Sequence, residues 1–283
     1  MRIDALLVAG LTRSFEFFPP KSDEESVVLA STLADLERLH PSFVSVTYRG
    51  GPESRQRTFD LVAHIEREGH LTAMAHLICV GHTRPEMAAI LAKYWAAGVE
   101  NVMALGGDAP TDGSRVDSEF AHAIELVELA REIGGFSIGV AAHPLGHPRS
   151  PDLVSDRRHL AKKLAAADFA VTQFFFRASE WAHLVGDLAD LGVDKPVLAG
   201  VMPVTTLSGI SRMAQMGAAV PEELATRLAR ADERAGPRAV REEGVAAAIE
   251  LCTELLELGV PGLHFYTLNR STATREIHDA LFG

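Results

Sequence analysis

The sequence contains few cysteines and no long apolar run, and each absence excludes a class of protein. Cys79 and Cys252 are the only two cysteines among 283 residues, and each lies inside an apolar segment. Two isolated thiols cannot build a disulfide framework, so we expect a reducing compartment and two core cysteines. No apolar stretch approaches the roughly 20 residues of a membrane span, and the first apolar segment is too short for a signal peptide. These features predict a cytoplasmic protein.

Charge and motif content narrow the possible partners. The formal net charge of −11 disfavours affinity for nucleic acid phosphates, so we expect small-molecule partners and neither nucleic acid nor membrane. G-x-G-x-x-G and Walker sequences are absent, which excludes a Rossmann crevice for a dinucleotide. No repeat or linker divides the chain, and 47% hydrophobic residues suffice for one large core. We therefore predict a single domain over residues 1–283.

Eight short apolar runs recur along the chain and are separated by helical segments. They are FEFF (15–18), FVSVTY (43–48), LTAMAHLI (71–78), NVMAL (101–105), FSIGVAA (136–142), FAVTQFFF (169–176), VLAGVM (197–202) and GLHFYTL (262–268). Runs of this length and composition are typical of parallel strands that are buried on both faces. Eight of them predict an α/β fold, a (β/α)8 TIM barrel.

The connecting segments carry helix boundary signals. These are two pairs with capping-box spacing, Ser22 with Glu25 and Thr83 with Glu86, and two helix-ending glycines, Gly69 and Gly192. Residues 205–258 hold more helix than one crossover needs, so we expect extra helices between strands seven and eight. The connections 108–118 and 143–156 are long and rich in turn-forming residues, which makes them candidate lids over a binding site.

Polar residues lie at or just beyond the carboxyl ends of the predicted strands. They are Glu16, Thr47, Tyr48, His76, Asp108, His143, Gln173 and Tyr266. In a (β/α)8 barrel these strand ends meet at one rim, which is where active sites are built. The convergence favours an enzyme.

Two carboxylates are candidates for chemistry. Glu16 lies inside an apolar strand, where desolvation favours the protonated form that a general acid needs, although a structural ion pair with Arg13 or Arg270 is an equal alternative. Asp108 follows two glycines, which allow close approach of a ligand to the backbone; its alternative role is to cap the following turn.

Two further interpretations of the polar residues are weaker. His76, Asp108, His143 and His147 could ligate zinc or iron, but none of these three histidines belongs to a His-x-His or Glu-x-x-His motif. A basic cluster could hold a phosphate or form a solvated helix face. Its members are Arg157, Arg158, Lys162 and Lys163.

Several segments together resemble the methylenetetrahydrofolate reductase family. They are SFEFFPPKSDEE (14–25), FVSVTY (43–48), AHL (75–77), ALGGD (104–108), TQFFF (172–176) and HFYTLNR (264–270). The match runs in order over almost the whole chain. The resemblance implies a barrel enzyme that reduces 5,10-methylenetetrahydrofolate to 5-methyltetrahydrofolate with electrons from NADH or NADPH, normally through bound FAD.

The resemblance also implies roles for individual residues. Glu16 matches the general acid that protonates N10 of the folate, and Asp108 matches a carboxylate that binds the pterin. The implied substrate-binding residues are Thr47, Tyr48, Gln173, Leu207, Tyr266 and Arg270, where Thr47 also matches a flavin contact and Leu207 replaces an aromatic residue that packs on ligand. The implied cofactor-binding residues are His76, Gly107, His143, His147, Asp156 and Lys163. No resident metal is implied.

The departures from the family pattern concentrate around the flavin. The Arg-Gly-Asp after the fourth strand is replaced by Gly106, Gly107 and Asp108, and AAAD (165–168) shortens a family motif. Three flavin-region side chains also differ, at Phe120, His143 and His159. Each lost charge-assisted contact costs about 1.5 to 3 kcal/mol. We therefore expect weak or absent FAD binding and direct hydride transfer from the nicotinamide. The alternatives are an ordinary FAD-dependent reductase, a metal-dependent hydrolase and a folate-binding protein without turnover.

Overall fold

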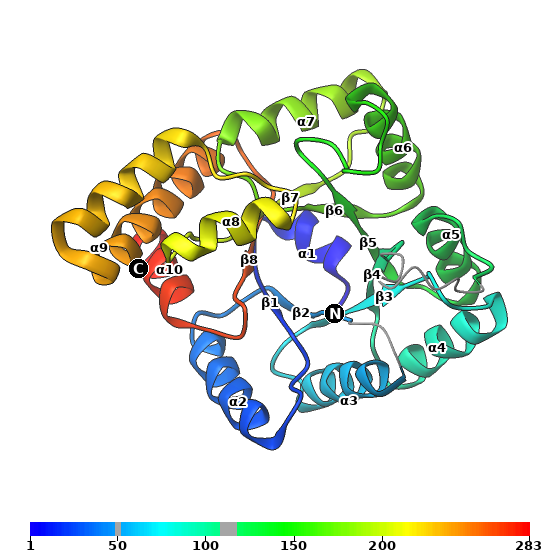
Figure 1. Ribbon diagram of the computed structural model, residues 1–283. Helices are drawn as coiled ribbons and strands as arrows, with labels where there is room; N and C mark the ends of the chain where they lie inside the picture. The colour runs from blue at the N-terminus through cyan, green and yellow to red at the C-terminus, as the bar shows by residue number, and fades with distance from the viewer. Residues whose placement is uncertain (49–51, 108–117) are drawn as a thin grey trace.

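The barrel strands lie side by side in the order in which they occur in the chain. The computed structural model describes residues 1–48, 52–107 and 118–283. Within these residues, eight parallel strands form a closed barrel in which β8 returns to pair with β1 (Figure 1). The strands are β1 (Thr12–Phe17), β2 (Phe43–Val46), β3 (Ala73–Ile78), β4 (Asn101–Leu105), β5 (Ser137–Ala142), β6 (Phe169–Thr172), β7 (Val197–Val201) and β8 (Gly262–Tyr266). The predicted (β/α)8 TIM barrel is confirmed.

Helices surround the barrel, and extra helices lie between β7 and β8 as expected (Figure 1). The helices are α1 (Ile3–Ala9), α2 (Asp23–Glu37), α3 (Pro52–Glu68), α4 (Arg84–Ala96), α5 (Ala123–Ile133), α6 (Leu153–Ala166), α7 (Ala178–Asp190), α8 (Leu207–Gln215), α9 (Glu222–Glu257) and α10 (Thr272–Phe282). Helix α9 is broken at Ala235 and Gly236, which have non-helical dihedrals directly before Pro237. The proline ring restricts the preceding residues and explains the position of the break.

Side chains alternate between the two faces of each strand and so divide the core. In β1, Phe15 and Phe17 are fully buried in the outer layer between barrel and helices, whereas Ser14 and Glu16 belong to the opposite face. An apolar cluster fills the lower barrel. Its fully packed members are Ile3, Phe43, Met74, Met103, Phe169, Val171 and Leu198. The polar side chains of β1 therefore have a packed floor beneath them.

The two expected capping boxes form to different degrees. The Thr83 hydroxyl accepts from the Glu86 N–H, and the Glu86 carboxylate accepts from the Thr83 N–H, which completes the box before α4. At α2 the Ser22 hydroxyl accepts from the Glu25 N–H, but the Glu25 carboxylate accepts from the Lys21 N–H at 2.8 Å. The box at α2 is therefore incomplete, because the Glu25 carboxylate binds the N–H of the residue before the N-cap and not that of the N-cap itself.

Other local predictions hold. Gly69 and Gly192 follow α3 and α7 with φ angles of +73° and +77°, the left-handed conformation that ends a helix. Cys79 and Cys252 are both buried and free, as expected for core packing. None of the helices in the described part of the chain is long and apolar enough to cross a membrane.

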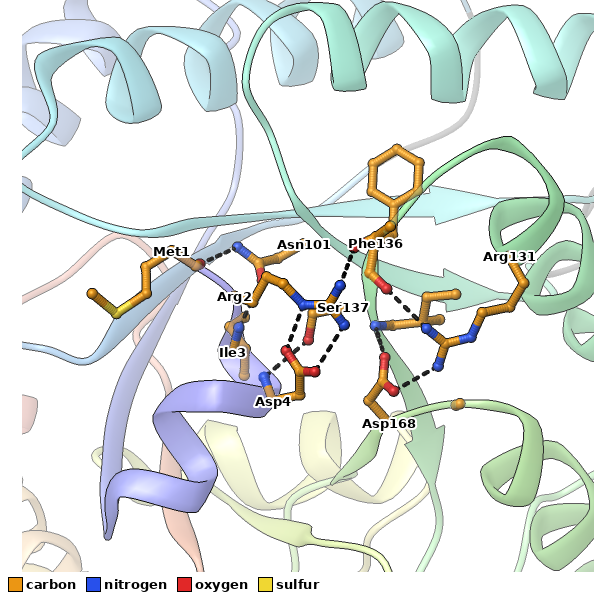
Figure 2. A network of polar contacts seen from close by, with 12 residues as sticks. Met1, Arg2, Ile3, Asp4, Asn101, Arg131, Phe136, Ser137 and Asp168 are labelled. Atoms are coloured by element: carbon orange, nitrogen blue, oxygen red, sulfur yellow. Dashed lines mark hydrogen bonds and ion pairs between the residues drawn. The ribbon is translucent and has the colours of Figure 1, made fainter.

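Helix α1 closes the N-terminal end of the barrel through a polar network (Figure 2). The Asn101 side chain, at the start of β4, accepts from the Ile3 N–H at 2.8 Å and donates to the Met1 carbonyl at 3.0 Å. Ser137, at the start of β5, accepts from the Asp4 N–H at 3.0 Å. Asn101 and Ser137 are both 0% exposed. These bonds hold Ile3 in the floor of the barrel, so the opposite, C-terminal end is the open one.

Replacing Asn101 with Ala is expected to lower the free energy of unfolding by about 2 to 3 kcal/mol. The change removes its hydrogen bonds and leaves the buried Ile3 N–H without a partner, which costs about 1 to 3 kcal/mol. Urea unfolding followed by circular dichroism measures the effect. Ser31→Ala on the exposed surface of α2 is the control and should change the free energy by less than about 0.5 kcal/mol. A loss for Asn101→Ala no larger than that of the control would show that the network does not stabilise the fold.

Candidate active site

The upper barrel contains a polar layer directly above the apolar floor. Parallel pairing places Glu16 of β1 opposite Ser45 of β2 and opposite Tyr266 of β8. Ser14 and Ser45 are fully buried, and His264, two residues before Tyr266, is 1% exposed. Strand alternation thus directs several polar side chains from neighbouring strands toward one region at the C-terminal half of the barrel.

Glu16 lies between two imidazoles in this layer. One carboxyl oxygen, Oε2, is 3.6 Å from Nε2 of His76 and 3.6 Å from Nε2 of His264. The Glu16 side chain is only 12% exposed. Among the described residues, the cationic or imidazole groups within 4 Å of this carboxyl are the two histidines, so the alternative of an ion pair with Arg13 or Arg270 is wrong. Arg13 instead contacts His278 and Phe282 at the outer wall, and Arg270 is exposed.

Two buried polar atoms near this layer have no hydrogen-bond partner within the described residues. They are Oγ1 of Thr47, which follows β2, and Nε2 of His76 in β3. Burial lowers the pKa of His76, and the neighbouring Glu16 charge opposes that shift only in part. An unpaired buried polar group costs about 1 to 3 kcal/mol, so both atoms are suited to bind a ligand.

His264 is the residue that the sequence interpretation missed. Its Nδ1 lies 2.7 Å from the Ser14 hydroxyl, and its ring stacks on Phe43 and meets the Tyr266 ring edge-on. A histidine inside a strand is most often an ordinary core residue, so the residue type alone did not indicate a functional role for His264. Its position could have done so, because His264 lies on the same strand face as Tyr266.

Tyr266 spans the top of β7 to reach β6. Its hydroxyl donates to the Thr172 carbonyl at 2.6 Å, and burial raises the pKa of this phenol well above 10. The intervening residue is Gly200, where an added Cβ would lie 2.2 Å from the Thr172 oxygen and 2.7 Å from the Tyr266 ring. Glycine at this position therefore allows the Tyr266 side chain to extend over β7 and reach β6.

The other expected substrate contacts are distributed around the rim. The Gln173 amide donates to the Met216 carbonyl at 3.2 Å and so joins the end of β6 to the end of α8. Leu207, the first residue of α8, is 37% exposed. Tyr48 turns instead toward α3, where its hydroxyl accepts from Arg55 at 3.4 Å. The structure brings Tyr266 to the Glu16 cluster but not Tyr48.

Arg157 and Asp156 organise the connection after β5. Arg157 is 4% exposed and donates to the carbonyls of His143 and Pro144, to Asp187, and to Asp156 at 3.2 Å. The other Asp156 oxygen accepts from the His147 N–H at 3.0 Å and from the Ser150 hydroxyl at 2.9 Å. Both carboxylate oxygens of Asp156 are therefore engaged within the protein.

Lys163 and the two rim histidines are also held by protein partners. The Lys163 ammonium donates to the Ala141 carbonyl at 2.8 Å, and burial lowers its pKa to about 8. The rings of His143 and His147 meet edge-on with centroids 4.6 Å apart. Of the basic cluster, Arg157 and Lys163 thus donate to backbone carbonyls and do not form a solvated helix face, while phosphate binding by the cluster stays a prediction.

The sequence matches the family model for methylenetetrahydrofolate reductase over residues 4–282. The chain belongs to the methylenetetrahydrofolate reductase family. It is 34% identical to the 5,10-methylenetetrahydrofolate reductase of Pectobacterium carotovorum over 94% of this chain and 89% of that protein. It is 33% identical to the enzyme of Escherichia coli K12 over 91% of this chain and 86% of that protein.

Solved structures support the barrel fold. A Clostridium thermocellum protein described as binding two copies of 5-methyl-5,6,7,8-tetrahydrofolic acid superimposes with a TM-score of 0.72, covering 98% of this chain and 96% of its own. Dihydropteroate synthase from Stenotrophomonas maltophilia gives 0.53 over 95% and 91%. The sequence identities are 11% and 15%, so these likenesses concern the fold alone.

Several positions that match flavin contacts of the methylenetetrahydrofolate reductase family have protein partners in this chain. The Asp156 carboxylate accepts three hydrogen bonds and the Lys163 ammonium donates one, which leaves donors on Lys163 for a ligand. Gly107 has a φ of +86°, and an added Cβ would lie 2.2 Å from Ile78. Its carbonyl accepts from Arg149 at 3.1 Å. The second glycine is thus required by packing, and not only by close approach of a ligand.

Two other expectations concern Asp108 and a metal site. Asp108 and most of the 108–118 connection lie outside the described residues. Within the described ranges, no group of three or more His, Cys, Asp or Glu side chains is arranged to hold a metal ion.

A cavity of about 740 Å³ lies between α2 and α3, lined in part by Leu29, Leu33 and Leu61. Glu16 does not line that cavity, so volume alone does not identify the active site of this reductase family member.

Acid is expected to destabilise the protein partly through His143. Burial, with nearby His147 and Lys163, lowers the pKa of His143 from 6.5 to about 4. Between these values the unfolded chain binds the proton and the folded chain does not, so stability falls as the pH decreases through this window.

His143→Gln should therefore flatten the dependence of unfolding free energy on pH between 6.5 and 4. The expected gain at the acid end relative to wild type is about 2 kcal/mol, from roughly 1.4 kcal/mol per pKa unit discounted for solvent screening. Urea titrations at several pH values measure it. The exposed His183→Gln variant is the control, and equal slopes in both variants would contradict the assignment.

Proposed function

We propose that residues 1–283 act as one catalytic domain that reduces 5,10-methylenetetrahydrofolate to 5-methyltetrahydrofolate, with NADH or NADPH as the hydride donor. Membership of the family supports the substrate and the reaction. The observation that carries the proposal is the Glu16 carboxyl, 12% exposed within a polar layer at the open end of the barrel. A carboxyl in such a site is suited to general acid catalysis.

Glu16 acts as the proton donor in the first step. Its O–H bond breaks as an N–H bond forms at N10 of the folate, and the bond between N10 and the methylene carbon breaks with its electron pair left on N10. The product is an iminium cation at N5 and a Glu16 carboxylate. The barrel floor excludes water below the acid, which strengthens the electrostatic interactions inside the site.

The remaining residues bind and orient the substrate. The Thr47 hydroxyl and the His76 Nε2 atom supply buried hydrogen-bonding groups. Asp108 is proposed as the carboxylate that holds the pterin and stabilises the iminium cation. We propose further substrate contacts from the rim residues Tyr48, Gln173, Leu207, Tyr266 and Arg270, and contacts to a bound cofactor from His76, Gly107, His143, His147, Asp156 and Lys163.

In the second step a hydride passes directly from the dihydronicotinamide to the iminium carbon. Two electrons and one hydrogen move together, which gives the N5-methyl group and the oxidised nicotinamide. The absence of an arginine before Gly107 and Asp108 supports a reaction without tightly bound FAD, because a cationic contact to the flavin is missing.

The test is NADH oxidation by protein stripped of flavin, with and without methylenetetrahydrofolate. We expect folate-dependent oxidation by colourless protein and formation of 5-methyltetrahydrofolate. Stoichiometric yellow cofactor, with activity lost on stripping and regained with FAD, would establish ordinary flavin-dependent catalysis and reject the direct step. Folate binding without NADH oxidation under either condition would reject the reductase assignment in favour of a binding protein.

A further inference from the structure

His264 occupies a fixed position beside the proposed acid. Its side chain is 1% exposed, and its ring centroid lies 6.0 Å from Phe43 with the planes inclined by 20°. The Tyr266 ring meets it at 5.3 Å and 89°, so the imidazole is held between two aromatic rings. Its Nε2 faces the Glu16 Oε2 atom at 3.6 Å.

Contacts at both ring nitrogens bear on the tautomer of this imidazole. The Ser14 hydroxyl lies 2.7 Å from Nδ1 and 3.4 Å from the Leu263 carbonyl, and its single proton can go to only one of them. A Glu16 carboxylate facing Nε2 can only accept, which favours a proton on Nε2 and leaves Nδ1 to accept from Ser14. When Ser14 donates to Nδ1, the ring proton of the neutral imidazole is on Nε2. That N–H then points toward the Glu16 carboxyl.

We propose that His264 is a positioning residue for Glu16, held by Ser14 as the Nε2–H tautomer. The assignment rests on the proposed function for its catalytic consequence, because the N–H stabilises the carboxylate that remains after Glu16 has protonated the folate. The separation of 3.6 Å is long for a direct bond, and catalytic hydrogen bonds shorten when substrate binds.

The other groups that face Glu16 come from β2, β3 and β8. His76 of β3 lies 3.6 Å from the same oxygen and has a lowered pKa, so it is neutral near pH 7. Ser45 of β2 is opposite Glu16 in register and 3.5 Å from the His264 Nε2. Tyr266 of β8 keeps its proton, because burial raises its pKa. His264 is thus the donor whose tautomer is fixed by a second side chain.

The kinetic test compares His264→Gln with His264→Leu. Glutamine places an amide donor near the Nε2 position, whereas leucine has a similar size and no donor. We expect His264→Leu to lower kcat about tenfold with KM for the folate changed less than threefold, and to move the alkaline limb of the kcat profile up by about one pH unit. His264→Gln should recover most of both. Equal losses in the two variants, or an unmoved pH limb, would overturn the positioning role.

A spectroscopic test reads the tautomer without relying on turnover. Long-range ¹H–¹⁵N correlation of histidine-labelled protein should show a protonated Nε2 and an unprotonated Nδ1 for His264. Ser14→Ala should release this preference and give a mixture of tautomers, even if His264→Leu fails to fold. Ser137→Ala makes the same change at the opposite end of the barrel and should leave the His264 signals unchanged. A protonated Nδ1 in wild type, as Nδ1–H or as imidazolium, would disprove the assignment.

The two tests separate failure of this inference from failure of the proposed function. If wild type shows no folate-dependent NADH oxidation, the proposed function fails, and the Nε2–H result still decides whether Ser14 fixes the imidazole. If wild type turns over and His264→Leu matches it, the positioning role fails while the proposed function stands.

Discussion

Glu16→Gln is expected to reduce turnover by about a hundredfold to ten-thousandfold, the range in which general acid catalysis contributes. Glutamine is nearly isosteric with glutamic acid, so the packing between β2 and β8 remains, but the amide cannot supply a proton to N10. The measurement is kcat with methylenetetrahydrofolate and NADH on flavin-stripped protein. Thermal unfolding should show a barrel that still melts cooperatively.

Glu37→Gln is the matched control for this variant. Glu37 is the exposed last residue of α2, so the same chemical change there should leave kcat within about twofold of wild type. Turnover by Glu16→Gln that equals the control would remove Glu16 from the acid role. Loss of turnover together with loss of cooperative melting would mean that the carboxyl is needed for the fold and would contradict the prediction.

Gly200→Ala should impair both stability and activity. The added Cβ would lie 2.2 Å from the Thr172 carbonyl oxygen and 2.7 Å from the Tyr266 ring, and neither atom belongs to a flexible side-chain end. Overpacking of this kind costs about 1 to 3 kcal/mol, and we expect the upper end because the clash is with backbone. Displacement of Tyr266 removes one of the two rings that hold His264 and also moves a proposed substrate contact, so kcat should fall more than tenfold.

Gly186→Ala on α7 provides the matched control for Gly200→Ala. Gly186 is exposed, and an added Cβ has no heavy atom within 4 Å. Alanine should stabilise the helix by up to about 1 kcal/mol and leave kcat unchanged. Chemical unfolding and steady-state kinetics on both variants measure the contrast. If Gly200→Ala behaves like Gly186→Ala, the hydrogen bond from Tyr266 over β7 to the Thr172 carbonyl is not needed for the site.

The sequence predicted which segments form strands more accurately than it predicted where each strand begins and ends. β1 begins at Thr12, three residues before the apolar FEFF run. Thr12 and Ser14 are buried but polar, so the hydrophobic pattern did not show that the strand starts there. β6 ends at Thr172, although the apolar run continues through Phe176. Phe174 and Phe175 lie beyond the strand but are still buried in separate clusters. Apolar runs report burial, and burial continues past the last strand bond.

Single candidate residues could be predicted, but their partners could not. Glu16 stood out because a carboxylate inside an apolar strand is costly. The sequence favoured neither His76 nor His264 over Arg13 or Arg270 as its neighbour, because register between strands distant in the chain fixes those contacts. The same holds for Lys163, whose ammonium donates to the Ala141 carbonyl.

The amino-acid sequence by itself determined the eight-strand barrel, the open end on which polar residues gather and the family to which the chain belongs. Local periodicity and short motifs carry this information, because they depend on residues that are close in the chain. Tertiary structure alone decided that Ser14 and His264 adjoin Glu16, that Gly200 makes room for Tyr266, and that Asp156 and Lys163 are occupied by protein partners. Those outcomes depend on barrel closure, which joins β8 to β1 across about 250 residues and has no signal in any local stretch of sequence.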